Sequence, residues 1–235
     1  MVRTVREPRR QTPVAAGSFW HDALAALRAT GFLPLLVLFM LVTLGLGTVS
    51  TMLPFFLSSR LQLSPGSQTL LLALLFIAAA LSVPLWTRLS ARWGKRRAFA
   101  GGLVALSLGL VLLVGLSPVG ELSAVLFLCT LLAGSGVGAV LLFPWALLPD
   151  VTAHDFSRTQ AQRDGLFYAL FTLCQTGAFA LSAALSGGVL ELSGYVSGAP
   201  MQSAGAVRGV SLLVGGVATG FFLLALLPLR RYRLR

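Results

Sequence analysis

Six polar side chains that could contact a polar solute recur within one apolar segment, residues 165–190. On an α-helix their spacing places them in a narrow stripe down one side: Tyr168, Thr172, Gln175, Thr176, Ser182 and Ser186. Polar groups in hydrocarbon are costly unless they face a protein interior or a water-filled cavity, so we expect the stripe to face inward. It is either the wall of a solute pathway or a set of hydrogen bonds between helices. The size of Tyr168 and Gln175 favours the pathway.

Residue patterns for catalysis or metal binding are not evident. The two histidines, His21 and His154, flank the apolar segments, and the sequence has no Gly-x-Ser-x-Gly or His-x-Glu motif. Cys129 and Cys174 lie inside apolar segments without a histidine or acidic residue at ligand spacing, and we expect them to be packing residues. The sequence therefore predicts that the protein is not an enzyme and has no metal site or cofactor.

The segment that carries the polar stripe is one of six long apolar runs. Each run is close to the roughly 20 residues that a helix needs to cross the hydrocarbon core of a bilayer. The runs are Phe32 to Leu57, Ser67 to Thr87, Ala98 to Ser117, Leu122 to Pro149, Gly165 to Leu190 and Gly209 to Leu229. A hydrophobic content of 56% over 235 residues exceeds what a soluble core of this size holds. We therefore predict an all-α membrane protein with six transmembrane helices.

The charged residues, 18 basic and 7 acidic, all lie between or beyond these runs. Apart from Arg60 and Arg208, every basic residue lies in the N-terminal segment, the second or fourth gap, or the tail. Because cytoplasmic gaps of membrane proteins collect Lys and Arg, we expect a multi-pass protein of the plasma (inner) membrane with both termini cytoplasmic. The net charge of +11 does not indicate nucleic acid, because the basic residues lie at span ends without interleaved aromatic stacking residues.

The charge map divides the chain into three parts. Residues 1–31 form a basic cytoplasmic segment, residues 32–229 the six-helix transmembrane bundle, and residues 230–235 a basic cytoplasmic tail. Apolar residues at helical spacing between Ser18 and Arg28 fit a short helix lying on the inner membrane surface. They fit equally well the first turns of a long span.

Glycines and prolines mark places where helices could pack closely or bend. The run from Gly134 to Gly138 and the pair Gly216 and Gly220 have the spacing that lets helix backbones approach each other in lipid. A phosphate-binding glycine loop is the alternative for the first run, but it would lie in mid-membrane with no following lysine. Pro144 and Pro149 predict either a bend used in gating or a plain helix end.

Two motifs resemble one family of transporters. The basic turn Arg92-Trp93-Gly94-Lys95-Arg96-Arg97 resembles the loop between the eighth and ninth helices of major facilitator transporters. The run Leu142-Phe143-Pro144-Trp145-Ala146-Leu147-Leu148-Pro149-Asp150-Val151 is similar to the end of the tenth helix in sodium-dependent lysophospholipid symporters. These belong, with melibiose permease, to the glycoside-pentoside-hexuronide:cation symporters. Further matches are Pro84-Leu85-Trp86, Leu166-Phe167-Tyr168 and Ser193-Gly194-Tyr195.

The resemblance implies that the six spans are the C-terminal half of a twelve-helix major facilitator fold. That half would serve a secondary active, cation-coupled transporter of a sugar or a lysolipid, with substrate held between the two halves. We expect the cavity to be lined by Tyr168, Thr172, Gln175 and Thr176, with Trp145 as an aromatic wall. We expect a cytoplasmic gate made by Gly94, Lys95, Arg96, Arg97 and Asp150. Asp150 either pairs with a loop arginine when the inner mouth is closed or is a solvated acid at a helix end.

One half cannot enclose a substrate, so besides the lipid bilayer and a small-molecule solute we expect a protein partner. That partner is a separate N-terminal half or a second copy of this chain. The family's cation-binding acids lie in the N-terminal half, which implies that the partner binds any coupling cation. The family often has a lysine at the position of Thr176, where this chain has no charge. The alternative function is a non-transporting membrane scaffold, or an inert truncated product, whose polar stripe only joins helices.

Overall fold

The computed structural model of the chain describes residues 31–116, 122–160, 163–196 and 202–231, together with Leu24, Ala26, Leu27 and Ala29. Within these residues every element of regular secondary structure is a helix, and short turns join the helices. The long elements are α2 (Phe32–Ser59), α3 (Pro65–Trp93), α4 (Lys95–Gly115), α5 (Ala124–Thr159) and α6 (Asp164–Leu192). A last stretch is divided into α7 (Ala204–Ser211), a π-helical segment η1 (Leu212–Ala218), α8 (Thr219–Leu224) and α9 (Leu226–Arg231).

Six helical stretches of the described residues are long and apolar enough to cross a membrane, which confirms the six predicted spans. The first five are α2 to α6, and the sixth runs from Ala204 to Arg230 through the divided last stretch. Several helices extend well past the apolar runs. At 1.5 Å per residue the 36 residues of α5 would reach about 54 Å, longer than a hydrocarbon core of about 30 Å. Most of the predicted short helix of residues 18–28 and most of the tail lie outside the described residues.

Serine caps start three of the spans. The side-chain oxygens of Ser64, Ser123 and Ser203 each accept a hydrogen bond from a backbone N–H three residues later. Such caps satisfy N–H groups that have no partner within the helix. Pro65 at the first position of α3 loses nothing there, because that N–H would be unpaired in any case. At the opposite end of the bundle, Gly94 separates α3 from α4 with a positive φ of 85°, a conformation that favours glycine.

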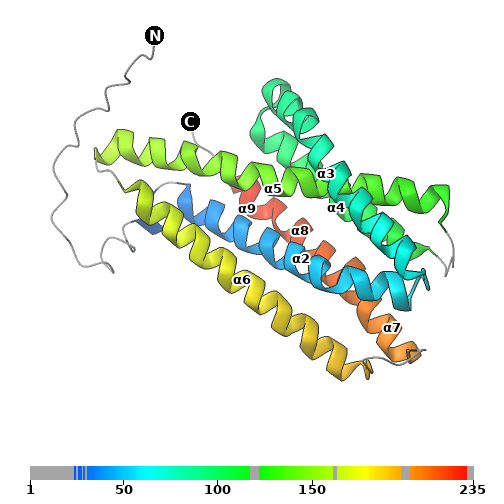
Figure 1. Cartoon of the computed structure of the whole chain (residues 1–235). Helices are drawn as coiled ribbons and strands as arrows, with labels where there is room; N and C mark the ends of the chain where they lie inside the picture. Colours follow the sequence, from blue (N-terminus) through cyan, green and yellow to red (C-terminus); the bar gives the residue numbers. More distant parts are fainter. Residues whose placement is uncertain are drawn as a thin grey trace, which may run out of the picture.

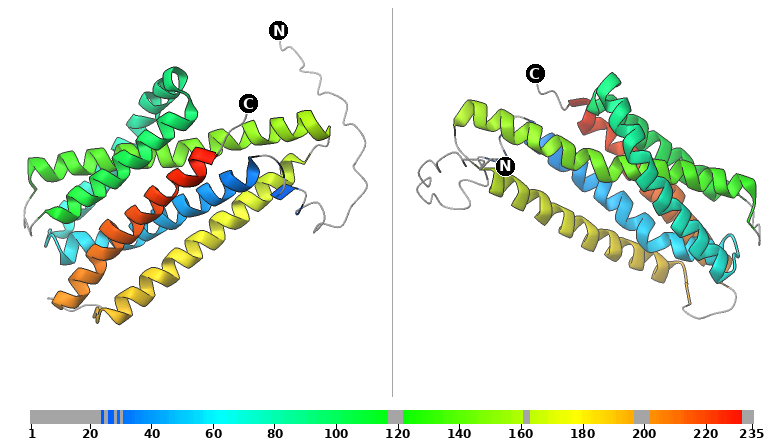
Figure 2. Two further views of the ribbon diagram at one scale, coloured as in Figure 1. Left: turned by 180° about the vertical axis from the view of Figure 1, so that it is seen from behind. Right: turned by 45° about the horizontal axis from the view of Figure 1, so that its top comes forward.

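The bundle consists of two groups of three consecutive spans, α2 to α4 and α5 to the last span. The first helix of each group packs against the other two helices of the opposite group. α5 runs along both α3 and α4, whereas α2 packs against α6 and the divided last span. Consecutive spans alternate in direction, so the start of α2, the end of α5 and the start of α6 lie at one end of the bundle (left in Figure 1). The α3–α4 turn projects from the bundle in all views, and α6 lies along an outer edge (Figures 1 and 2). Because each group packs its first helix into the other group, the two groups of three spans are interlocked.

The glycine run of α5 is where these helices come closest. A Cβ atom at Gly134 would lie 2.6 Å from the carbonyl oxygen of Leu75 in α3, and one at Gly136 would lie 2.6 Å from the Cα atom of Leu106 in α4. Beside this contact the indole nitrogen of Trp86 donates a hydrogen bond of 2.7 Å to the carbonyl oxygen of Ser135. The predicted packing role of Gly134 to Gly138 is therefore confirmed, and no phosphate loop is formed.

One of two alternatives and one detail of the sequence prediction are wrong. Helix α5 continues through Pro144 and Pro149 to Thr159, which excludes the plain helix end, and the bend used in gating stays a prediction. In the last span, Gly220 has open space where a side chain would be, and Gly216 faces only Leu212 of its own helix. The close contact is made instead by Gly215, whose Cβ would lie 2.8 Å from a methyl group of Val114 in α4. The small-residue spacing was correct for packing, but the π-helical turn shifts which glycine meets the neighbour.

We predict that Gly136→Ala destabilises the bundle by about 1–3 kcal/mol, because its methyl group would press on the backbone of α4 and force the helices apart. Thermal unfolding of the purified chain in detergent would measure this as a lower midpoint. Gly177→Ala is the matched control, since a Cβ at Gly177 of α6 meets no atom within 4 Å. An unchanged midpoint for Gly136→Ala would contradict the close approach of α4 and α5.

Candidate functional site

The polar stripe of α6 divides into a buried and an exposed part. Ser182 and Ser186 are buried, and the Cβ atom of Ser182 would lie 2.9 Å from a Cβ at Gly47 of α2. Tyr168 is 39% exposed, Thr172 and Thr176 are also exposed, and Gln175 is half-buried. The crossing of α2 over α6 shifts the contact face along the helix, so residues that share a stripe in the sequence do not share an environment.

Hydrogen bonds of the stripe stay within α6. The hydroxyl of Thr176 donates to the carbonyl oxygen of Thr172 at 3.1 Å, and that of Ser182 donates to Phe179 at 2.8 Å. The buried hydroxyl of Ser186 has no hydrogen-bond partner among the described residues. Within this part of the chain, then, the stripe does not join α6 to another helix.

Helix α6 is the least buried and the least apolar of the six spans. In the most apolar stretch of 18 residues within each helix, only 22% of the residues of α6 are buried inside the bundle, compared with 67% of those of α2. The next least buried span is α3, at 33%. Polar side chains in the middle of a membrane have a high free energy when they contact lipid tails. The polar side chains on the exposed side of α6 would be stabilised by contact with water or with another protein surface.

Trp145 belongs to an aromatic cluster that joins α2, α5 and α6. The rings of Phe39 and Phe171 are stacked with centroids 3.7 Å apart, and Trp145 meets both edge-on, at 5.8 and 5.3 Å respectively. Trp145 remains 39% exposed, whereas Phe39 and Phe171 are buried. Since Gln175 lies one helical turn after Phe171, aromatic and polar side chains adjoin on this side of the bundle.

The predicted gate residues Lys95 and Asp150 form an ion pair. The Lys95 Nζ atom lies 2.7 and 2.8 Å from the two carboxylate oxygens of Asp150, and 3.1 Å from the carbonyl oxygen of Ala146. The pair links the first residue of α4 to α5. Of the two alternatives for Asp150, a pair with a loop arginine or a solvated acid at a helix end, neither is correct as stated. The partner of Asp150 is Lys95, because the turn at Gly94 directs the first residue of α4 toward α5.

The other loop residues make different contacts. Arg96 donates a hydrogen bond of 2.6 Å to the backbone carbonyl of Arg230, which connects the loop to α9. Arg97 is exposed and lies with Arg96 beside an apolar groove between α4 and α9. Thus the structure brings together Lys95 with Asp150 and Arg96 with Arg230, and leaves Arg97 outside both contacts.

Sequence reasoning missed Phe39 and Phe171. Both are phenylalanines within long apolar runs, so nothing in their type distinguishes them from other lipid-facing or core residues. Only the packing of α2 and α6 against α5 shows that they meet Trp145. Among the described residues, no group of three His, Cys, Asp or Glu side chains is placed to hold a metal ion.

The comparisons with known proteins agree with the helical arrangement. A family model described as "MFS/sugar transport protein" matches residues 2–235. The chain is 26% identical over 158 residues to the sodium-dependent lysophosphatidylcholine symporter 1-A of Danio rerio, covering 66% of this chain and 29% of that protein. It is 30% identical over 143 residues to the sphingosine-1-phosphate transporter MFSD2B of Xenopus tropicalis, covering 60% and 27%.

A third relative, the uncharacterized symporter sll1374 of Synechocystis, is 39% identical over 64 residues, covering 27% of this chain and 12% of that protein. The aligned part therefore spans less than a third of each of these three relatives. The exchange of first helices fits the three-plus-three repeats within each half of the major facilitator fold. The chain belongs to the MFS/sugar transport protein family and is an integral multi-pass membrane protein of a family of transporters, not of enzymes.

Proposed function

We propose that this chain acts as the C-terminal half of a cation-coupled secondary transporter, with the exposed face of α6 on the solute pathway. The observation that carries the proposal is the set of polar side chains on that face, Tyr168, Thr172 and Thr176, which bond to no other helix of the described chain. A lipid-facing position would leave these groups in hydrocarbon. A water-filled pathway satisfies them.

The low burial of α6 and α3 supports a protein partner that covers these helices. The partner is an N-terminal six-helix half or a second copy of this chain, and any coupling cation is bound there, because α6 carries no charge between Asp164 and Glu191. Substrate would lie at the midplane between the two halves. The basic loop and both termini would lie in the cytoplasm, on the inner side of the plasma membrane.

A lysolipid-type solute fits this face better than a sugar. The aromatic cluster of Phe39, Trp145 and Phe171 lies beside the polar residues of α6. An amphipathic solute could place its apolar part against the aromatic rings and its polar part against the polar side chains. Two relatives carry lysophosphatidylcholine or sphingosine-1-phosphate in their names, which supports the same solute class. The alternative function as a scaffold gains no support from the stripe, whose hydroxyls form no hydrogen bond to another helix within the part of the chain that the structure describes.

Thiol labelling of a cysteine at position 176 tests the pathway. We predict that Thr176→Cys, in a background where Cys129 and Cys174 are replaced by serine, reacts with a water-soluble thiol reagent in membranes. Lysophosphatidylcholine should slow this reaction severalfold, and melibiose should not. Protection by melibiose alone would overturn the choice of lysolipid while leaving the pathway intact.

The control for this labelling is Leu108→Cys in α4. Leu108 is 49% exposed and lies 13 residues from the start of α4, and Thr176 lies 12 residues from the start of α6, so the two sites have similar depth. Both helices begin at the same end of the bundle. If Thr176→Cys and Leu108→Cys react equally slowly, α6 faces lipid or protein and the pathway proposal fails.

The ion pair of Lys95 and Asp150 should hold this end of the pathway closed. We predict that Lys95→Gln speeds labelling of Thr176→Cys from the cytoplasmic side by up to about fivefold. The effect is limited because both side chains are more than 40% exposed, and exposed pairs contribute about 0.2–1 kcal/mol. Inside-out membrane vesicles would give the labelling rate.

Two further variants separate the ion pair from loop charge. Arg97→Gln removes one positive charge from the same loop without touching either partner, and should leave the rate unchanged. The exchanged pair Lys95→Asp with Asp150→Lys should return the rate toward that of the parent. Equal acceleration by Lys95→Gln and Arg97→Gln would mean that loop charge, and not the pair, controls access.

A further inference from the structure

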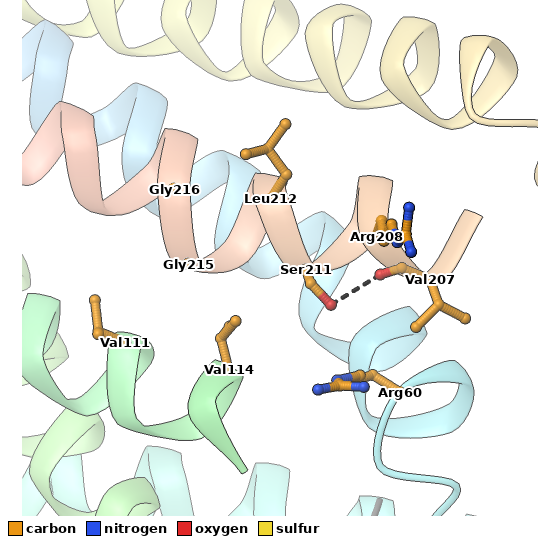
Figure 3. A pocket seen from close by; sticks show the side chains of 9 residues that line it. All are labelled: Arg60, Val111, Val114, Val207, Arg208, Ser211, Leu212, Gly215 and Gly216. Carbon is orange, nitrogen blue, oxygen red and sulfur yellow. Dashed lines mark hydrogen bonds between the residues drawn. The ribbon is translucent and has the colours of Figure 1, made fainter. Parts of the chain in front are cut away.

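A groove of about 500 Å³ lies between α4 and the last span, on a part of the bundle that the proposed pathway does not use. Figure 3 shows the guanidinium groups of Arg60 and Arg208 at one end of this outer groove, with Val111 and Val114 of α4 and the glycines Gly215 and Gly216 toward the other. The groove therefore has a cationic mouth and an apolar floor.

Arg60 and Arg208 are the two basic residues that depart from the charge map of the chain. Arg60 ends α2 and Arg208 lies on α7, both at the end of the bundle opposite Lys95. Among the described residues neither guanidinium has an acidic partner, and the ion pair formed there joins two other residues, Lys95 and Asp150. Two arginines at the same end of a groove without a counter-charge attract an anion.

The π-helical segment η1 contributes Gly215 and Gly216 to the floor of the groove. Gly215 packs on Val114, so α4 and η1 are in contact below the groove, and Gly216 in the next position leaves its surface uncovered. π-helical turns are rare and occur frequently at functional sites. Leu212, which also lines the groove, is exposed.

The dimensions and depth of the groove suit a phospholipid. From Arg208 to Gly216 the last span rises by about 12 Å, if each residue adds about 1.5 Å. The arginines lie at the ends of transmembrane helices, where headgroups are found, and the floor lies deeper, where acyl chains are found. A small soluble anion would use the mouth only and leave the apolar floor unfilled.

We propose that the outer groove binds one anionic phospholipid, with its phosphate between Arg60 and Arg208 and an acyl chain along Val111, Val114 and Gly216. Such a lipid fastens α4 to the last span at the end opposite the basic loop. It is a resident of the bilayer bound at the periphery, separate from a solute carried past α6.

Native mass spectrometry of the full chain in detergent micelles, titrated with dioleoylphosphatidylglycerol, tests this site. We expect the first lipid to bind more tightly than dioleoylphosphatidylcholine. Arg60→Gln and Arg208→Gln should each raise its Kd about fivefold, and together about 25-fold, as expected for about 1 kcal/mol per basic residue near anionic lipid. Gly216→Leu, which fills the floor, should raise the Kd as well.

Three controls make the result specific. Gly220 lies one turn further along the same span, with open space around it. The Gly220→Leu variant should therefore bind the lipid with an unchanged Kd. Arg88→Gln removes an exposed charge at the other end of the bundle and should also leave the Kd unchanged. Circular dichroism and gel-filtration profiles verify that each variant is folded.

Several outcomes would overturn the site. If Arg88→Gln weakens binding as much as Arg60→Gln does, the effect is one of overall charge. If sn-glycerol 3-phosphate displaces the lipid at equal concentration, the groove recognises a soluble anion and not a phospholipid. Equal affinity of the parent chain for the two lipids would refute anion recognition without the use of any variant.

Discussion

The close approach of α5 to α3 and α4 is the contact on which the rest of this structure depends. In a bilayer the hydrophobic effect does not drive helices together, because lipid tails are as apolar as leucine. Association then depends on close packing and on polar contacts between backbones and side chains. Glycines at 134, 136 and 138 remove side chains where α5 meets its two neighbours, and the indole of Trp86 adds a hydrogen bond across the same contact.

This packing determines where the proposed site residues of α5 lie. Trp145 and Asp150 follow the glycines on the same helix, and the helix remains continuous through Pro144 and Pro149. The position of α5 set by the glycine contact therefore also sets the position of Trp145 in the aromatic cluster with α2 and α6. The same position places Asp150 next to Lys95, the first residue of α4. A movement of α5 relative to α4 would change the ion pair and the aromatic wall together, because one helix carries both.

The sequence was sufficient for features that depend on composition along one helix. The six spans, the glycine contact of α5 and the family follow from apolar length, small-residue spacing and the proline-tryptophan motif. Features that depend on how two helices cross were not predictable. The stripe of α6 divided because Ser182 is buried against α2 and Ser186 is buried as well, whereas Thr172 and Thr176 are exposed. The partner of Asp150 is Lys95 and not an arginine, because the turn at Gly94 decides which basic residue meets α5.

The α4 side and the α6 side of the bundle differ in how charged, polar and apolar residues are distributed along them. Two grooves lie between α4 and the last span. The outer groove has Arg60 and Arg208 at its mouth, the groove at the opposite end of the bundle has Arg96, Arg97 and Arg230, and the other residues that line the two grooves are mostly apolar. That order matches the cross-section of a bilayer, whose headgroups border a hydrocarbon centre. α6 also has charged residues near its ends, Asp164 and Glu191, but it differs in carrying uncharged polar groups near its middle. Since such a face is unstable against lipid tails, we infer that the bundle presents its α4 side to lipid and its α6 side to protein and water.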